Sequence, residues 1–152
     1  MTLSEIVFAS GGQPFEDGPD RGRIIVDGDS TGGGYALMEW LIAANETVIE
    51  DSDYGPHSHG ACEETFLIRS GHLDFLLGDV VTTLGPGDFV RVPKGVRHGY
   101  CNTSGRPVDL LVSFYPAGLE TLFIKYRTDR TAPLPSEGFV AEATRRFAST
   151  FE

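Results

Sequence analysis

The sequence predicts a single all-β domain, a barrel or sandwich of short strands, followed by one or two helices. Glycine and proline separate short runs of strand-forming residues over most of the chain. His57 and His59 stand two residues apart, the spacing that puts two side chains on one face of a strand. Near the C-terminus apolar residues recur at helical spacing instead. The length of 152 residues and a hydrophobic fraction of 40% suffice for one core and leave no room for a second catalytic domain.

The predicted elements divide the chain into three parts. Residues 1–22, with several glycines and prolines, are expected to form an irregular arm, residues 23–116 the barrel, and residues 117–152 a helical extension. Gly78 and Asp79 form the expected hairpin turn between two of the strands. The expected strands are residues 23–26, 35–42, 46–50, 64–69, 72–77, 80–84, 89–92, 98–102 and 108–115.

Two apolar stripes predict the C-terminal helices. Their members lie three or four residues apart, which places them on one helix face. A proline-rich connector at residues 131–135 separates the two stripes. Packing on the outside of the barrel is the expected way to bury them. The stripes consist of Leu119, Leu122, Phe123 and Tyr126, and of Phe139, Ala143, Phe147 and Phe151.

Charge and composition limit the classes of partner. Twelve basic and 22 acidic residues give a net charge of −10, which repels phosphate backbones and anionic lipids. We therefore expect neither a nucleic-acid partner nor a membrane partner. The N-terminus lacks the basic and apolar regions of a signal peptide, so a cytoplasmic location is expected. Two cysteines, Cys62 and Cys101, do not make a disulfide framework. Cys62 is expected to be a free loop thiol, with a soft metal ligand as the alternative.

Three histidines and a carboxylate predict a metal site. His57 and His59 can present two nitrogens on one side of a strand, and Glu64 and His98 can complete the set from neighbouring strands. Neutral nitrogens with one anionic oxygen suit a single divalent iron, manganese, nickel, copper, cobalt or zinc ion. Four such ligands leave coordination positions for water, dioxygen or a substrate oxygen.

Other polar residues near these ligands have two open interpretations each. Glu63 is an alternative ligand, but the six residues from Glu64 to Gly71 favour Glu64 and place Glu63 outside. Glu39 is a candidate general base facing the cavity, or a partner of Arg69 or Arg91 in a salt bridge.

Two residues share the strand face of His98 by the period of two. Tyr100 is a candidate catalytic residue that would line the pocket or orient a ligand, and Asn102 would do the same or end the strand. His72 is expected to be a solvated strand position.

The spacing of these residues resembles the two motifs of the cupin superfamily. Only Gly55 departs from the pattern, since it lies closer to His57 than the family's leading glycine does. The resemblance, which extends to small bacterial cupins described as quercetin-dioxygenase-like, implies a double-stranded β-helix (jelly-roll barrel). The matching residues are His57, His59, Glu64 and Gly71 for the first motif, and Gly87, Pro93, Gly95, His98 and Asn102 for the second.

The resemblance also implies an activity. We expect a metal-dependent oxygenase or dioxygenase acting on a small phenolic or enolisable molecule. A redox-neutral polyketide cyclase or isomerase is the alternative, and a small-molecule-binding cupin without turnover is the third possibility. The apolar residues available to line a pocket, or to serve as plain core, are Phe66, Ile68, Phe75, Tyr100 and Phe114.

A homodimer is expected from the need to cover sheet edges. Residues 24–26 precede a glycine-rich joint and could pair with a neighbouring copy. The alternative is that this strand folds back on its own barrel and leaves the chain monomeric.

Overall fold

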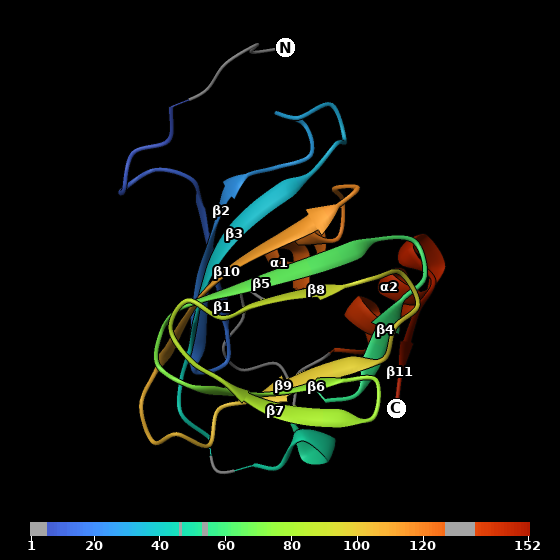
Figure 1. Ribbon diagram of the computed structural model, residues 1–152. Helices are drawn as coiled ribbons and strands as arrows, with labels where there is room; N and C mark the ends of the chain where they lie inside the picture. The colour runs from blue at the N-terminus through green and yellow to red at the C-terminus, as the bar shows by residue number, and fades with distance from the viewer. Residues whose placement is uncertain (1–5, 46, 53–54, 127–135) are drawn as a thin grey trace.

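The computed structural model describes residues 6–45, 47–52, 55–126 and 136–152. Two antiparallel sheets face each other and enclose one core (Figure 1). The larger sheet has the strand order β1-β2-β3-β10-β5-β8, and the smaller one β11-β4-β9-β6-β7. The all-β prediction is thus confirmed. The strands are β1 Gln13–Asp17, β2 Asp20–Val26, β3 Ala36–Ile42, β4 His57–His59, β5 Glu63–Ser70, β6 Leu73–Leu77, β7 Val80–Leu84, β8 Phe89–Val92, β9 His98–Cys101, β10 Val108–Tyr115 and β11 Ser149–Phe151.

The register of the larger sheet decides which side chains enter the barrel. Glu64 of β5 lies opposite Phe114 of β10 and Val92 of β8, and the next inward position, Phe66, lies opposite Val112. All of these residues are buried. Because strand side chains alternate between faces, the intervening residues of β5 point away from the core. One face of β5 therefore carries both the core aromatics and a carboxylate.

The two helices, α1 Glu120–Tyr126 and α2 Glu137–Phe147, cover one end of this core (Figure 1). The ring of Phe123 lies 4.7 Å from Trp40 of β3 and 5.5 Å from Phe139 of α2, measured between ring centroids. Helix α2 begins at the cap residue Ser136, whose hydroxyl accepts the backbone N–H of Phe139. The expected packing of both helices on the barrel is confirmed.

Helix α2 ends earlier than the apolar spacing predicts. Ala148 adopts a left-handed conformation with φ of 49°, which terminates the helix after Phe147. The following residues form β11, so Phe151 belongs to a strand, and the prediction that it continues the helical stripe is wrong.

Two further expectations about local structure are wrong. Residues 13–22 are not an irregular arm, because β1 and the start of β2 form a hairpin in which Phe15 lies opposite Gly22. Residues 1–5 lie outside the described part of the chain. The strand expected at residues 46–50 is absent from its described part, 47–50, where the 3-10 helix Ile49–Asp51 begins. Residue 46 itself is not described.

Strand β2 pairs with β3 of its own chain, with Ile24 opposite Met38. Residues 24–26 thus take the folded-back arrangement that the sequence left open, and they do not need a second copy as a pairing partner. Among the described residues, neither helix is long and apolar enough to cross a membrane.

Candidate metal centre

Four side chains from three strands converge inside the barrel. His57 and His59 come from β4, Glu64 from β5 and His98 from β9. One possible ligand atom from each lies within 4.8 Å of the others. His57 and His98 are register partners on neighbouring strands, and their ring centroids are 4.2 Å apart. The structure therefore brings together the four residues predicted as metal ligands.

The carboxylate of Glu64 faces two of the rings. Its Oε2 lies 3.1 Å from Nε2 of His98 and 3.7 Å from Nε2 of His59. These three residues are buried, whereas His57 is partly exposed. The ligand set is thus open to solvent on the side of His57 and closed behind His98.

Backbone carbonyls fix the orientation of two of the imidazoles. Nδ1 of His57 lies 2.7 Å from the carbonyl oxygen of Gly55, and Nδ1 of His98 lies 3.0 Å from that of Val96. A carbonyl can only accept, so Nδ1 carries the proton in both rings and Nε2 keeps its lone pair. For His98 this lone pair faces Glu64. A hydrogen bond from Nδ1 to a backbone carbonyl, as in His57 and His98, is the usual support of a ligating histidine.

His59 is held differently. Its Nδ1 lies 2.6 Å from the hydroxyl of Ser149, which belongs to the C-terminal strand β11. Burial lowers the pKa of His59 well below its usual value, and the charges of His57 and His98 lower the pKa further. A neutral imidazole is the form that binds a metal ion.

The donor set fits a divalent transition metal. Its three imidazole nitrogens and one carboxylate oxygen are intermediate in hardness and suit iron, manganese, nickel, cobalt, copper or zinc. A single carboxylate among neutral nitrogens is a poor match for calcium or magnesium, which prefer oxygen ligands throughout.

The low pKa of His59 predicts a pH dependence of stability in the metal-free protein. Between the folded-state pKa and the unfolded value of about 6.5, the unfolded chain binds a proton that the folded chain does not. The free energy of unfolding should hold above pH 6.5 and fall below it, by up to about 1.4 kcal/mol per pH unit from this group. Urea unfolding from pH 5 to 7.5 measures the slope. The slope should be shallower in His59→Gln and unchanged in the control variant His72→Ala, which changes an exposed histidine. Equal slopes in all three proteins would mean that His59 does not cause the pH dependence.

Glu63 does not take part in the site. It points outward from β5, and its carboxylate accepts two hydrogen bonds from Arg91, at 2.8 and 2.6 Å. The prediction that Glu63 faces out while Glu64 faces in is confirmed.

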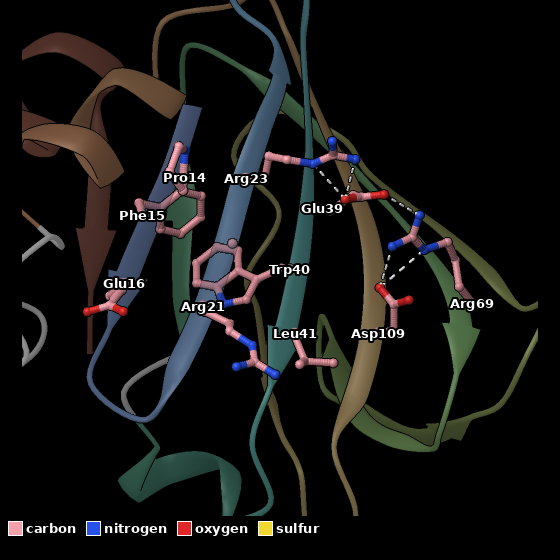
Figure 2. Close-up of a pocket in the computed structure, with 11 residues that line it drawn as sticks. Pro14, Phe15, Glu16, Arg21, Arg23, Glu39, Trp40, Leu41, Arg69 and Asp109 are labelled. Carbon is pink, nitrogen blue, oxygen red and sulfur yellow. Dashed lines mark hydrogen bonds and ion pairs between the residues drawn. The ribbon is translucent and has the colours of Figure 1, made fainter. Parts of the chain in front are cut away.

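Glu39 lies on the outer face of the larger sheet, so the expectation that it faces the cavity as a general base is wrong. Its register partner Leu111 and the inward-facing Met38 and Trp40 show that Glu39 points away from the core. The carboxylate bridges Arg23 and Arg69, at 2.6 and 2.7 Å, and Arg69 continues to Asp109 (Figure 2). The alternative prediction, a salt bridge, is therefore correct for Arg69. The second partner of Glu39 is Arg23, whereas Arg91 pairs with Glu63.

These ion pairs border a surface hollow of about 390 Å³ (Figure 2). Its lining includes Arg21, Leu41 and Asp109, but none of the four converging residues. The lining residues that form ion pairs with one another are Arg23, Glu39, Arg69 and Asp109.

Tyr100 and Asn102 lie two and four residues after His98, and their surroundings differ. Tyr100 is buried against Phe66 and Phe75, with ring centroids 5.5 and 5.9 Å away, and the ring of Phe75 is also 6.5 Å from that of His98. The amide of Asn102 donates to the backbone carbonyls of Ile42 and Arg106. Asn102 therefore closes the end of the strand.

The residues expected to line a pocket divide between two surroundings. Phe66, Phe75 and Tyr100 pack beside His98. Phe114 packs towards α1, with its ring 6.3 Å from that of Phe123, and Ile68 is buried in the same core. The aromatic wall nearest the ligands is thus formed by three of the five residues.

The two thiols are predicted to be unreactive in the native protein. Cys62 is a free thiol in the connection between β4 and β5, as expected, and its side chain is buried in the core. Burial together with the charge of Glu64 raises its pKa to about 12. Burial raises the pKa of Cys101 to about 11. Since the thiolate is the reactive form, a disulfide reagent at pH 7.5 should label neither cysteine until the protein is unfolded. Rapid labelling of the folded protein would contradict this prediction.

Comparison of the sequence and the structure with known proteins supports the fold described above. Residues 44–114, which include all four ligands, match the family described as Cupin domain. Comparison with curated protein sequences gives no match.

Several solved structures share the architecture at low sequence identity. KdgF from Halomonas sp. superimposes with a TM-score of 0.64 at 14% identity, covering 78% of this chain and 99% of that one. The polyketide cyclase RemF from Streptomyces resistomycificus superimposes with a TM-score of 0.59 at 21% identity, and the match covers 74% of this chain and 80% of RemF. A predicted oxalate decarboxylase from Thermotoga maritima superimposes with a TM-score of 0.64 at 15% identity, and the match covers 74% of this chain and 99% of that protein. The chain thus has the cupin fold, and His57, His59, Glu64 and His98 lie within the part that matches the Cupin domain.

Proposed function

We propose that the protein is a metal-dependent enzyme, an oxygenase acting on a small phenolic or enolisable oxygenated molecule. The observation that carries this proposal is the convergence of His57, His59, Glu64 and His98 at one partly open site. When bound there, a redox-active metal would allow dioxygen to react with an enolate or phenolate, and a redox-inactive one would polarise a carbonyl.

The residues around the ligands support chemistry on an organic molecule. His59, Glu64 and His98 are buried, so water reaches the ligand set mainly past His57. Phe66, Phe75 and Tyr100 form an apolar wall behind His98. A low-polarity wall strengthens the electrostatic interactions of a bound oxyanion.

Glu64 and Tyr100 are the candidate catalytic residues. Glu64 has one carboxylate oxygen 3.1 Å from His98, and it is an acceptor placed to hold a substrate proton if it leaves the ligand set. Tyr100 shares the strand face of His98 and would orient a bound aromatic substrate through its ring.

A redox-neutral cyclase or isomerase is the second candidate. The polyketide cyclase RemF has the same fold, so the fold is compatible with such chemistry. A cupin that binds a small molecule without turnover is the third.

Oxygen uptake separates these candidates. The protein would be purified without added metal, its metal content measured, and a panel of phenols and 1,3-diketones assayed with an oxygen electrode. Substrate-dependent oxygen consumption supports the oxygenase, and product formation without oxygen consumption supports the cyclase or isomerase. Binding without any turnover favours the third candidate.

Glu64→Gln and Glu63→Gln form a matched pair of variants for this assay. The two glutamates are neighbours in β5, but only Glu64 faces the histidines, whereas Glu63 pairs with Arg91 on the outer face. Activity should be lost in Glu64→Gln and retained in Glu63→Gln. Equal activities would contradict the proposed site.

We also propose a homodimer, because the edge strands β1, β7, β8 and β11 expose unpaired backbone groups within the described sheets. Light scattering at micromolar concentration tests this proposal, and a monomeric mass would reject it.

A further inference from the structure

The C-terminal strand β11 lies against β4, the strand that carries two of the four ligands (Figure 1). Ser149 is the register partner of His59, and Phe151 that of His57. Flanking backbone hydrogen bonds extend this contact: Gly60 donates to Ala148 at 3.1 Å. At the other end the N–H of Glu152 donates to the carbonyl of Pro56 at 3.0 Å.

Strand β4 depends on this contact because its other neighbour supports it weakly. β4 has three residues, and its register with β9 consists of the single pair His57 and His98. Its register with β11 spans all three of its residues. Strand β4 also accepts the N–H of Gly95 at the carbonyl of His59, 2.8 Å away, but its strand pairing comes mainly from β11.

Ser149 makes the contact that is specific to a ligand. The outer nitrogens of His57 and His98 are held by carbonyls only two residues away in the chain. The outer nitrogen of His59 is held by a hydroxyl 90 positions away, at 2.6 Å, and both side chains are buried. Loss of this hydroxyl would remove the hydrogen bond that the described residues give to Nδ1 of His59, and the ring could then turn or change tautomer.

The remaining residues of the strand hold it in place. The ring of Phe151 stacks on that of His57, with centroids 5.9 Å apart and an interplanar angle of 14°. The single N–H at Nε of Arg97 donates a bifurcated hydrogen bond to the carboxylate of Glu152, 2.9 Å from each oxygen, and Arg97 directly precedes His98. Thr150 points to the other side, where its hydroxyl meets that of Ser58 at 2.7 Å.

We infer that residues 149–152, the C-terminal clasp, position the metal centre: Ser149 orients His59, Phe151 orients His57, and docking of the clasp is coupled to metal binding. This inference rests on the metal site of the proposed function. Coupling is reciprocal, so a clasp that favours metal binding must itself be stabilised by the metal.

Substitution of Ser149 tests the positioning role. Co²⁺ is the probe, because its visible absorption reports ligand geometry and its affinity can be measured by competition with an indicator. Ser149→Ala should weaken Co²⁺ binding by about 10- to 100-fold, the usual effect of removing an outer hydrogen bond from a ligating histidine. It should also alter the Co²⁺ absorption spectrum.

Thr150→Ala is the matched control. It removes a hydroxyl bond of similar length from the next residue of the same strand, but the partner is Ser58, which is not a ligand. Its affinity and spectrum should equal those of the wild type. Phe151→Leu should weaken binding in the same direction as Ser149→Ala, because it removes the ring that stacks on His57.

Amide hydrogen exchange of the wild-type protein supplies a measurement that needs no variant. Co²⁺ is paramagnetic, so Zn²⁺ is the probe for this NMR experiment. Zn²⁺ should slow exchange at Gly60 and Glu152, whose N–H groups bridge the clasp to β4. Unchanged exchange at both amides would overturn the coupling.

The outcomes separate this inference from the metal site itself. Wild-type protein that binds neither Co²⁺ nor Zn²⁺ would overturn both the metal site and the clasp. Wild-type binding together with equal affinities in Ser149→Ala and Thr150→Ala would overturn the clasp alone.

Discussion

Replacing His98 by alanine is expected to abolish stoichiometric metal binding. His98 is fully buried, its Nε2 lies 3.1 Å from Glu64, and its ring is wedged between the other histidines and the aromatic wall. Loss of a ligand should exceed the effect of losing an outer hydrogen bond, so the affinity should fall by more than about 100-fold. Metal analysis after dialysis against a weak chelator measures the remaining content.

A second histidine provides the control for this experiment. His72 is exposed next to Gly85 and lies outside the four converging residues. His72→Ala should retain the metal content of the wild type. Because His98→Ala opens a cavity, far-ultraviolet circular dichroism must first show that the variant is folded, and His98→Gln offers a less disruptive alternative. Equal metal content in His98→Gln and His72→Ala would contradict ligation by His98.

Strand alternation explains why the ligands could be predicted from the sequence. In β5 a polar or charged residue stands at nearly every outward position, and Phe66 and Ile68 mark the inward face, so the strand period assigns Glu64 to the interior and Glu63 to the outer face. The same reasoning fails in β3. Its residues are apolar on both faces apart from Glu39, so the pattern gives no indication of which face is buried.

The C-terminal contribution to the site could not be predicted, for two physical reasons. Three-residue strands such as β4 and β11 are too short to show a period. The helical spacing also continues through Phe151, whereas the chain leaves the helix at Ala148 without the glycine that usually marks a left-handed cap. Ser149 therefore carried no signal, because its function depends on a contact with a residue 90 positions away.

Buried Glu120 is a further feature that only the structure reveals. Its carboxylate accepts the backbone N–H groups of Gly28 and Gly118, at 3.0 and 2.5 Å, and so ties the connection after β2 to the start of α1. Nothing in the sequence predicts a buried carboxylate here, because Asp and Glu are rarely fully buried.

Removal of the metal is expected to cost a large part of the stability of the protein. An ion that binds only the folded chain stabilises it by RT ln(1 + [L]/Kd), which is about 4 kcal/mol when the free metal is 1,000 times the Kd. For a domain of this size a change of 1 kcal/mol moves the melting temperature by about 2–4 °C, so saturation should raise it by about 8–16 °C over the chelated protein.

The structural reason is that the four ligands join three strands from two sheets. β4 and β9 belong to the smaller sheet and β5 to the larger one, and a bound ion would tie them together at a point where three imidazoles and a carboxylate otherwise meet without a cation. Calorimetry with and without chelator measures the shift. The chelator should leave the melting temperature of His98→Gln unchanged, because that variant has lost the ion already. An equal shift in both proteins would mean that the chelator acts elsewhere, and no shift in the wild type would count against a well-formed metal centre.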